Sequence, residues 1–401
     1  MALYGFNPDS KFVHPLPVQR DALEAMDRTD RSGVVVLPCG SGKSFLILSQ
    51  ALKKMNTLIL CYESQGVLQI RDMILRETTW PPALLHAFTH ELRGEAPAEE
   101  ASIVVTTYGM FSASLERRAK ETGLVSSSIF KKKWDLMLLD EVHHAPAKTY
   151  EPFIRSLLPN VARVLGFTGT LSRELDSAHI EAIRTGRKTR EECVESMFRF
   201  LTPESSLPLV LFERTLSDME QDGAVAKVTV ARVETPMTPS FAAAYAMCGG
   251  ITQKYIAMVH PNKLKVLHAI VHLHAARGDI GVIFCDHLFP VRIVSEMLGP
   301  SWGVLSGSTT GSDDAARHSA KANRLIIEKF NRKELAGVIV TSVAESAVNF
   351  DHEAFQWAAL VDGHGGDAAS AQKIGRLSRT PLLARKKGEN DTALAARQRA
   401  M

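Results

Sequence analysis

The segment from Gly33 to Lys54 constrains the fold of this chain more than any other. Gly33–Leu37 is a short apolar run that predicts a buried strand, and Phe45–Lys54 has the pattern of a helix. The turn between them is rich in glycine and reads Pro38-Cys39-Gly40-Ser41-Gly42-Lys43-Ser44. Such a turn lets backbone N–H groups surround a phosphate, while its lysine neutralises charge and its serine hydroxyl binds Mg²⁺. The segment therefore predicts a phosphate-binding loop in an α/β domain.

Short apolar runs recur along the chain and are separated by stretches with a helical pattern. Near-continuous apolar strands of this kind indicate parallel sheets covered by helices on both faces. The predicted strands are Gly33–Leu37, Thr57–Cys61, Ile103–Val105, Leu136–Leu139, Val161–Phe167, Gly281–Cys285, Trp302–Leu305, Gly337–Thr341 and Trp357–Val361. Since 401 residues allow two to three domains, we expect two α/β domains, residues 1–222 and 223–401, with an irregular polar stretch at about 176–223.

A pair of acids gives the second chemical signal. Asp140 and Glu141 directly follow the predicted strand Leu136–Leu139. An acid at the carboxyl end of a parallel strand can bind Mg²⁺, and its neighbour can orient and deprotonate an attacking water. A lone acidic pair is often only a surface loop. Here it follows a phosphate loop in the same predicted domain, which favours a site for nucleotide hydrolysis.

A basic segment in the other predicted domain gives the third signal. It reads Gln372-Lys373-Ile374-Gly375-Arg376-Leu377-Ser378-Arg379. Arginines three residues apart share a helix face, and a guanidinium there can reach a γ-phosphate bound by the first domain. In isolation the pair would indicate a solvated basic face, but the other two signals favour a catalytic role.

Composition excludes several classes of protein. The chain is 45% hydrophobic and 23% charged, as in ordinary globular proteins and unlike disordered ones. The net charge of +3 indicates no partner, but residues 371–401 carry eight basic and two acidic side chains, which favours contact with a polyanion. The five cysteines contain no CxxC pair and indicate a reducing compartment. Without a signal-peptide pattern or an apolar run of about 20 residues, we expect no membrane partner.

Together these residues resemble superfamily 2 helicases, and within them the XPB-type helicases, the translocase subunit of transcription factor TFIIH and its archaeal relatives. That family also has Leu-Pro-Cys-Gly at the position of Leu37-Pro38-Cys39-Gly40, where the strict loop pattern has an earlier glycine. Further matches are Ser64, Gln69, Thr107-Tyr108, Asp140-Glu141-Val142-His143, Pro146-Ala147-Lys148, Pro261-Asn262-Lys263, His364-Gly365-Gly366 and Arg385-Lys386-Lys387-Gly388. The resemblance runs from about residue 15 to 388. It implies two RecA-like, P-loop NTPase domains with parallel sheets, use of ATP and Mg²⁺, and 3′-to-5′ tracking on DNA.

The resemblance also implies roles for single residues. Gln19 matches the glutamine that reads the adenine, and Thr168-Gly169-Thr170 matches the motif that couples hydrolysis to strand contact. The implied ATP-binding residues are Gln19, Pro38, Cys39, Gly40, Ser41, Gly42, Lys43 and Ser44. The implied Mg²⁺ ligands are Ser44 and Asp140. The implied catalytic residues are Lys43, Asp140, Glu141, Arg376 and Arg379, the last two as arginine fingers.

Several positions depart from the family pattern. Ala344-Glu345 replaces a Gly-Asp pair, and Asn349 replaces an aspartate. Lys373 replaces the first arginine of the finger motif, and Ala368-Ala369 replaces a basic pair. An Arg-Glu-Asp motif implicated in strand opening here reads Arg173-Glu174-Leu175. The sequence begins almost at the glutamine motif, so we expect a shortened relative or a fragment without the damage-recognition region.

The resemblance leads us to expect an ATP-dependent DNA helicase or double-strand translocase that acts in nucleotide-excision repair and transcription initiation. The expected partners are DNA, duplex or single-stranded and independent of sequence, and subunits of a TFIIH-like complex. The expected location is the nucleus in a eukaryote and the cytoplasm otherwise. Two alternatives remain: an RNA helicase, since Asp-Glu-x-His motifs occur there too, and a RecA pair with impaired coupling that serves as a docking or regulatory ATPase.

Overall fold

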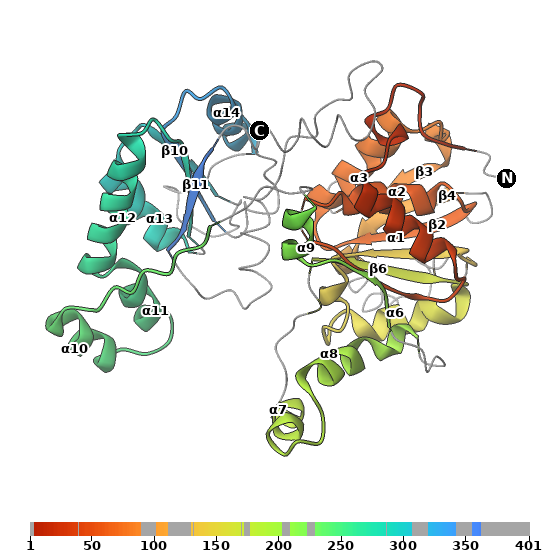
Figure 1. The fold of residues 1–401 in the computed structure, drawn as a ribbon, viewed down its shortest axis with the longest axis horizontal. Helices are drawn as coiled ribbons and strands as arrows, with labels where there is room; N and C mark the ends of the chain where they lie inside the picture. Colours follow the sequence, from red (N-terminus) through yellow and green to blue (C-terminus); the bar gives the residue numbers. More distant parts are fainter. Residues whose placement is uncertain are drawn as a thin grey trace, which may run out of the picture. The chain divides into compact units, whose positions relative to one another are not determined.

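The computed structural model describes residues 4–38, 40–89, 102–110, 130, 132–169, 171, 177–202, 209–222, 229–285, 287–306, 320–341 and 355–361. These ranges form two units, residues 4–222 and 229–361, each with its own parallel sheet (Figure 1). The predicted division after residue 222 adjoins residues 223–228, which lie outside the described ranges, so the exact domain bounds remain a prediction.

The first unit has a seven-stranded sheet in the order β3-β4-β2-β5-β6-β1-β7. Every pairing in it is parallel. The strands are β1 (Gly33–Val36), β2 (Asn56–Cys61), β3 (Leu85–Ala87), β4 (Ser102–Thr107), β5 (Leu136–Asp140), β6 (Val164–Thr168) and β7 (Val210–Glu213). The central strands are buried on both faces, which is why their sequences read as continuous apolar runs.

Alternate side chains of these strands enter two separate cores. Val35, Ile59 and Leu138 pack with the helices of one face, and Val34, Leu58 and Leu139 face the opposite layer. The first layer consists of α1 (Pro17–Asp27), α2 (Lys43–Ala51) and α3 (Ser64–Glu77), and the second contains α6 (Glu151–Leu157) and α8 (Arg190–Phe198) (Figure 1). The period of two along each strand therefore produces a three-layer α/β unit.

The second unit has a four-stranded parallel sheet in the order β11-β8-β10-β9. Its elements are α10 (Pro239–Met247), α11 (Gly250–Val259), α12 (Pro261–Ala275), β8 (Gly281–Phe284), α13 (Leu288–Leu298), β9 (Trp302–Leu305), α14 (Ala320–Asn331), β10 (Gly337–Val340) and β11 (Trp357–Leu360). Leu267 of α12 and Val291 of α13 join Ile283 and Ile339 in one core, so these two helices cover the same face of the sheet. The α/β architecture with two parallel sheets is the one that the sequence predicts.

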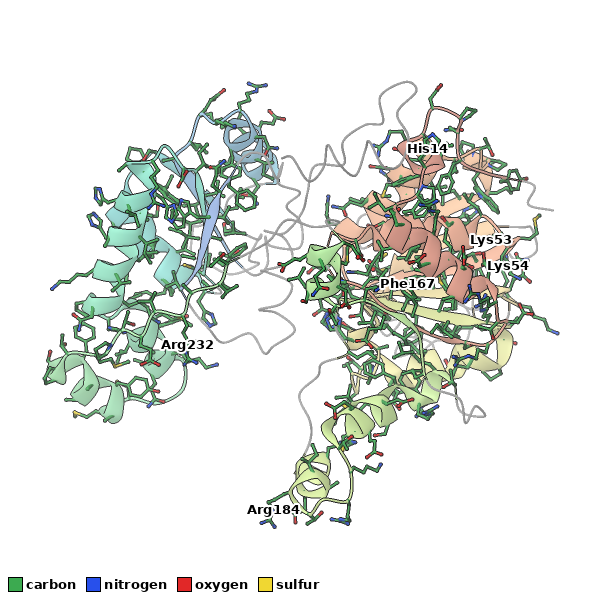
Figure 2. The ribbon with its side chains drawn as sticks, viewed as in Figure 1. His14, Lys53, Lys54, Phe167, Arg184 and Arg232 are labelled. Carbon is green, nitrogen blue, oxygen red and sulfur yellow. The ribbon has the colours of Figure 1, made fainter. Side chains whose placement is uncertain are left out.

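The nine predicted strands are confirmed, but two further strands and three helices were not predicted. β3 and β7 have only three and four residues and no fully buried position, so they lack a continuous apolar run. The expectation of an irregular stretch at about 176–223 is wrong, because it contains α7 (Ser177–Arg184), α8, β7 and α9 (Leu216–Gln221). Thr189 and Thr215 start α8 and α9 with capping boxes. Figure 2 shows Phe167 inside the first unit and Arg184 at the end of α7, far from that core.

The longest helix in the described ranges is α12, with 15 residues. Among those ranges, none of the helices combines the length and the apolar character needed to cross a bilayer.

Candidate nucleotide-binding site

Three loops of the first unit meet at one edge of its sheet. β5, β6 and β1 are neighbouring parallel strands, so their carboxyl ends lie at the same edge. The register pairs Val36 with Thr168 and Asp140 with Phe167. Ligands of parallel α/β sheets bind at this edge. The strand order thereby joins the phosphate loop to the acidic pair, which lie far apart in the sequence.

The phosphate loop depends on two glycines with left-handed backbone conformations. Gly40 has a φ of 87° and Gly42 a φ of 84°, and Gly42 is the residue that precedes α2. A Cβ atom on Gly42 would lie 2.1 Å from Gln19 Nε2, so both the backbone angle and the contact require glycine. The loop therefore ends at the N-terminus of α2, whose free N–H groups favour an anion.

Two polar side chains of the loop differ in how they are held. Lys43, the first residue of α2, donates from Nζ to the carbonyl of Leu37 at 3.2 Å. Ser41 is buried, and its Oγ has no hydrogen-bond partner within the described ranges. Burying a hydroxyl without a partner is costly, so the site has an unused polar group at the position where a phosphate would bind. Ser44 lies half-buried in the first turn of α2.

Gln19 of α1 contacts the same loop. Its side chain is buried, its Nε2 donates to the Ser41 carbonyl at 2.9 Å, and its Oε1 accepts from the Leu16 N–H at 2.8 Å. An amide side chain has two N–H donors and two acceptor lone pairs. One donor and one lone pair therefore remain for a ligand, while the other two fix the amide on the loop.

The acidic pair lies on a strained turn at the end of β5. Glu141 has a φ of 48° and a ψ of 53°, a left-handed backbone conformation that residues other than glycine rarely adopt. Asp140 accepts a hydrogen bond at Oδ1 from the Glu141 N–H at 3.1 Å, and its carbonyl accepts one from the Tyr108 hydroxyl at 3.0 Å. Backbone strain of this kind is concentrated at functional sites. Here it places two carboxylates next to the phosphate loop.

The surroundings push the pKa values of the two carboxyls apart. Burial, with a smaller contribution from the Glu141 charge, raises the pKa of Asp140 to about 7, although the Lys43 ammonium opposes the shift. Burial alone would raise the pKa of Glu141, but the Lys43 ammonium, a hydrogen bond from His143 and the charge of His144 together lower it to about 2. Asp140 is therefore the carboxyl that a bound cation would most strongly stabilise in its charged form.

His143 connects the acidic turn to the end of β6. Its Nδ1 lies 2.9 Å from Thr168 Oγ1 and 3.3 Å from Glu141 Oε2. The turn itself packs on the same strand, because a Cβ atom on Gly166 would lie 2.7 Å from the Val142 side chain. A change at Thr168 can thus reach Glu141 through one imidazole.

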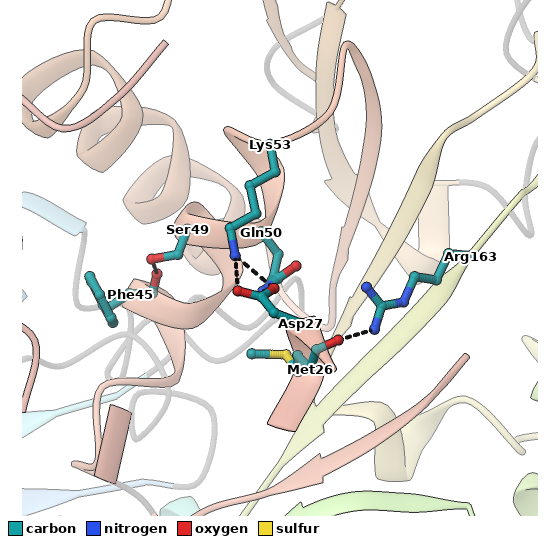
Figure 3. A network of polar contacts seen from close by, with 7 residues as sticks. All are labelled: Met26, Asp27, Phe45, Ser49, Gln50, Lys53 and Arg163. Carbon is teal, nitrogen blue, oxygen red and sulfur yellow. Dashed lines mark hydrogen bonds and ion pairs between the residues drawn. The ribbon is translucent and has the colours of Figure 1, made fainter. Parts of the chain in front are cut away.

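Behind the site, a polar network fixes α1 against α2 and the sheet (Figure 3). Asp27 accepts hydrogen bonds from Lys53 Nζ at 2.6 and 2.7 Å and from Gln50 Nε2 at 3.1 Å. The buried Arg163, just before β6, donates to the Met26 carbonyl at 2.7 Å and to the Arg31 carbonyl at 3.1 Å. The C-terminal end of α1, the helix that carries Gln19, is therefore held both by Lys53 and Gln50 and by Arg163.

The structure brings together Gln19, Pro38, Gly40, Ser41, Gly42, Lys43, Ser44, Asp140 and Glu141 in one unit. Their predicted chemical roles remain predictions. Several predicted residues lie outside the described ranges, namely Cys39, Thr170, Arg173-Glu174-Leu175, Ala344-Glu345, Asn349, His364-Gly365-Gly366, Ala368-Ala369, Lys373, Arg376, Arg379 and Arg385-Lys386-Lys387-Gly388.

Sequence reasoning did not assign roles to Asp27, Tyr108 and Arg163. Tyr108 matched a family motif, which was its only signal. Asp27 and Arg163 act through helix ends and backbone carbonyls, and Arg163 meets Met26 across 137 sequence positions. No periodicity or spacing reveals such a contact.

The residues at this edge fit both a phosphate group and a divalent cation. The left-handed glycines leave room for a close approach to the backbone, and Ser41 Oγ is buried without a partner. Carboxylate and hydroxyl oxygens, such as those of Asp140 and Ser44, are the ligands that Mg²⁺ prefers.

Comparison with known families follows the same division of the chain. Residues 12–173 match the family described as type III restriction enzyme, res subunit. Residues 219–395 match the ERCC3/RAD25/XPB C-terminal helicase. The second half of the chain is thus similar to the XPB-type helicases. This confirms the resemblance that the loop and acid motifs indicated.

Curated XPB relatives align over most of this chain. The general transcription and DNA repair factor IIH helicase/translocase subunit XPB of Schizosaccharomyces pombe is 26% identical over 367 residues, which are 90% of this chain and 41% of that protein. The subunit of the same name from Encephalitozoon cuniculi is 27% identical over 351 residues, 87% of this chain and 47% of that protein. The chain thus spans less than half the length of these relatives.

A solved structure supports the fold independently of the family match. The helicase domain of Hef from Pyrococcus furiosus superposes with a TM-score of 0.54 at 15% identity, covering 91% of this chain and 93% of that domain. The two parallel α/β units therefore have the fold of a solved helicase domain.

Proposed function

We propose that this chain is an ATP hydrolase that uses the energy of hydrolysis to move along DNA. The observation that supports this most directly is the meeting of Gln19, the phosphate loop and the Asp140–Glu141 pair at one sheet edge. ATP hydrolysis needs three parts on one domain: a residue that recognises adenine, a loop that binds phosphate and an acid that activates water.

In this proposal the adenine and the phosphates bind to different ends of one continuous surface. Gln19 offers its remaining N–H and lone pair to the adenine edge, a bidentate pattern that a glutamine amide matches. The N-terminus of α2 and the Lys43 ammonium bind the β- and γ-phosphates. Lys43 leaves its contact with the Leu37 carbonyl to do so.

Asp140 and Ser44 are the residues that would bind Mg²⁺. When present, the ion neutralises phosphate charge that develops during hydrolysis. Burial and a pKa of about 7 leave Asp140 poised between its protonated and charged forms, and a cation favours the charged one.

Glu141 orients the attacking water in this proposal. Its pKa of about 2 keeps it ionised at neutral pH, so its oxygens accept hydrogen bonds from a water molecule. His143 Nδ1 lies within reach of both this carboxylate and the Thr168 hydroxyl. Hydrolysis at Glu141 is thereby connected to the end of β6, from which the coupling motif begins.

Arg376 and Arg379 are proposed as arginine fingers from the second domain, and the basic residues 371–401 as a source of DNA backbone contacts. Double-strand tracking with 3′-to-5′ polarity, action in nucleotide-excision repair and transcription initiation, and assembly with TFIIH-type subunits are the finer parts of the proposal. The repair, transcription and complex-assembly parts rest on the XPB relatives, which carry repair and transcription factor names, and the polarity rests on the motif resemblance alone. For a eukaryotic source, the nucleus is the corresponding location.

The test is a steady-state ATPase assay with and without duplex DNA, single-stranded DNA and RNA. We expect stimulation by DNA above RNA. K43A should abolish turnover by removing the phosphate contact, whereas E141Q should block turnover but keep ATP binding, because Asp140 and Lys43 remain. E63Q, a change of an acid outside the site, serves as the matched control and keeps full turnover. Wild-type turnover in K43A or E141Q would exclude this site as the ATPase centre.

A regulatory or docking ATPase is the second candidate. The specific observation in its favour is the replacement of the usual Gly-Asp pair by Ala344-Glu345, in a motif that contacts DNA in this family. A regulatory or docking ATPase would show ATP turnover that depends on Lys43 and Glu141 but is unchanged by any nucleic acid. Stimulation by RNA above DNA would instead support an RNA helicase.

A further inference from the structure

Two histidines form a pair on the exposed side of α12. His268 and His272 are four residues apart and therefore lie one above the other on a single helix face. Leu267 and Val271, about 100° round the helix from the pair, are buried against the sheet. The pair consequently projects from a helix whose position is fixed by its own core contacts. Neither imidazole belongs to the nucleotide site, which lies in the other unit.

The two rings point at each other. His268 Nε2 and His272 Nε2 are 3.1 Å apart, and the ring centroids are 4.2 Å apart at an interplanar angle of 62°. At this distance one Nε2–H donates to the lone pair of the other ring, so at least one imidazole is neutral. Two imidazole nitrogens that share one tetrahedral zinc ion, with Zn–N bonds of about 2.0–2.1 Å, lie about 3.3 Å apart. The observed spacing is already close to that of two ligands on one ion.

We propose that His268 and His272 form a two-imidazole binding site for a divalent transition-metal ion of the zinc class. The proton between the two Nε2 atoms must leave the donor nitrogen: a doubly protonated ring releases it to solvent, whereas a neutral ring changes to its Nδ1–H tautomer, and both Nε2 lone pairs then bind the ion. His272 lies in the last turn of α12, where the helix dipole favours a positive charge. The ion needs little rearrangement of either side chain.

The ligand chemistry selects the kind of ion. Neutral imidazole suits zinc, copper and nickel, whereas Mg²⁺ and Ca²⁺ prefer oxygen. The site is therefore distinct from any Mg²⁺ function at Asp140. Among the described residues no group of three or more potential metal ligands occurs, so the two imidazoles leave positions on the ion open to further ligands such as water. An ion with open positions is the form that can bridge to a second molecule.

The neighbouring histidines have other contacts. His274 Nδ1 lies 2.9 Å from Asp279 Oδ2, and its ring stacks on Trp357 with centroids 4.8 Å apart. His260 is buried and accepts from the Lys263 N–H at the start of α12. The two exposed rings are thus the histidines of α12 that are arranged to bind an ion together.

The experiment is isothermal titration of the full chain with ZnCl₂, without nucleotide and in saturating Mg²⁺. The decisive comparison is with H272A/L273H, which keeps the number of histidines but moves the second ring off the face of His268. Leu273 is exposed, so the change is compatible with folding. We expect one zinc equivalent to be lost or weakened by about 100-fold, the smaller end of the gain from linking two ligands. H14A, which changes an exposed histidine of the other unit, should leave that equivalent intact.

A spectroscopic readout distinguishes this site from any other zinc-binding group in the chain. Electron paramagnetic resonance of one added equivalent of Cu²⁺ should show two nitrogen ligands in the wild-type chain and one in H268Q. Circular dichroism without metal checks that the variants are folded. Equal zinc affinity in the wild type and H272A/L273H, or a copper signal unchanged in H268Q, would overturn the proposal.

Discussion

Single residues decide whether the phosphate loop can form. Gly42 meets two separate demands, because its φ of 84° is left-handed and its missing Cβ leaves room for Gln19 Nε2. Glu141 differs from Gly42, because it has a left-handed backbone conformation although it carries a bulky side chain. Gly42 adopts its angle without steric cost, whereas the backbone of Glu141 carries strain that positions its carboxylate.

G42A tests the loop at this scale. The added methyl group costs about 1–2 kcal/mol of backbone strain and also displaces the Gln19 amide. We expect both a loss of stability and a rise in the KM for ATP. The matched control is G186A, where φ is 68° but a Cβ atom meets nothing within 4 Å. G186A should lose similar stability and keep the KM, as measured by thermal melting and ATPase kinetics. Equal KM values for both variants would contradict the role of the Gln19 contact.

The sequence predicted the site residues better than the contacts that hold them. The Gly40–Ser44 turn and the Asp140–Glu141 pair have signatures because their chemistry fixes residue type and spacing. The left-handed angle of Glu141 could not be predicted, since nothing local to a glutamate specifies it. The Arg163–Met26 contact had no signal either, because it joins a side chain to a backbone carbonyl in a distant segment.

At the level of elements, the position of α1 matters more than its length. Gln19 lies near the start of this helix, and Asp27 is its last residue. Asp27 joins α1 to α2 through Lys53 and Gln50.

The buried strands could be predicted from the sequence because burial on both faces leaves a continuous apolar run. The short edge strands β3 and β7 could not be predicted in this way.

D27A tests whether this anchor positions the adenine reader. Without the carboxylate, α1 loses its hydrogen bonds to Gln50 and Lys53, and Gln19 is held less accurately on the loop. We expect the KM for ATP to rise by about 3- to 10-fold with little change in kcat, and discrimination against GTP to fall. E24A is the matched control, because its exposed ion pair with Arg28 stays within α1. A fall in kcat alone, or the same effect in E24A, would exclude a positioning role.

The proposed reaction uses residues from both predicted domains. The first unit holds the phosphate loop and both acids, but Arg376 and Arg379 belong to the other predicted domain. A finger from a second domain acts only when the two domains close on ATP. Binding and turnover should therefore depend on different parts of the chain.

R376A and R379A separate these two steps. An arginine finger contributes about 10³–10⁵ in turnover. Each variant should lower kcat strongly while the Kd for ATP, measured by titration of a fluorescent analogue, stays near the wild-type value. R397A, in the same basic segment, should keep the DNA-independent kcat. A weaker Kd with unchanged kcat would mean that the arginines contact the ground state instead.

The strand order of the first sheet also has a consequence for synthesis on the ribosome. Within the described sheet, β1 lies between β6 and β7, which are encoded about 130 or more residues later than the strand itself. Until translation has passed residue 168, the strand that leads into the phosphate loop has neither of these neighbours to pair with, and the second follows only at residue 213. A nascent chain that ends earlier exposes an unpaired apolar strand, which is the kind of surface that chaperones bind. The loop is thus made early and fixed in place late.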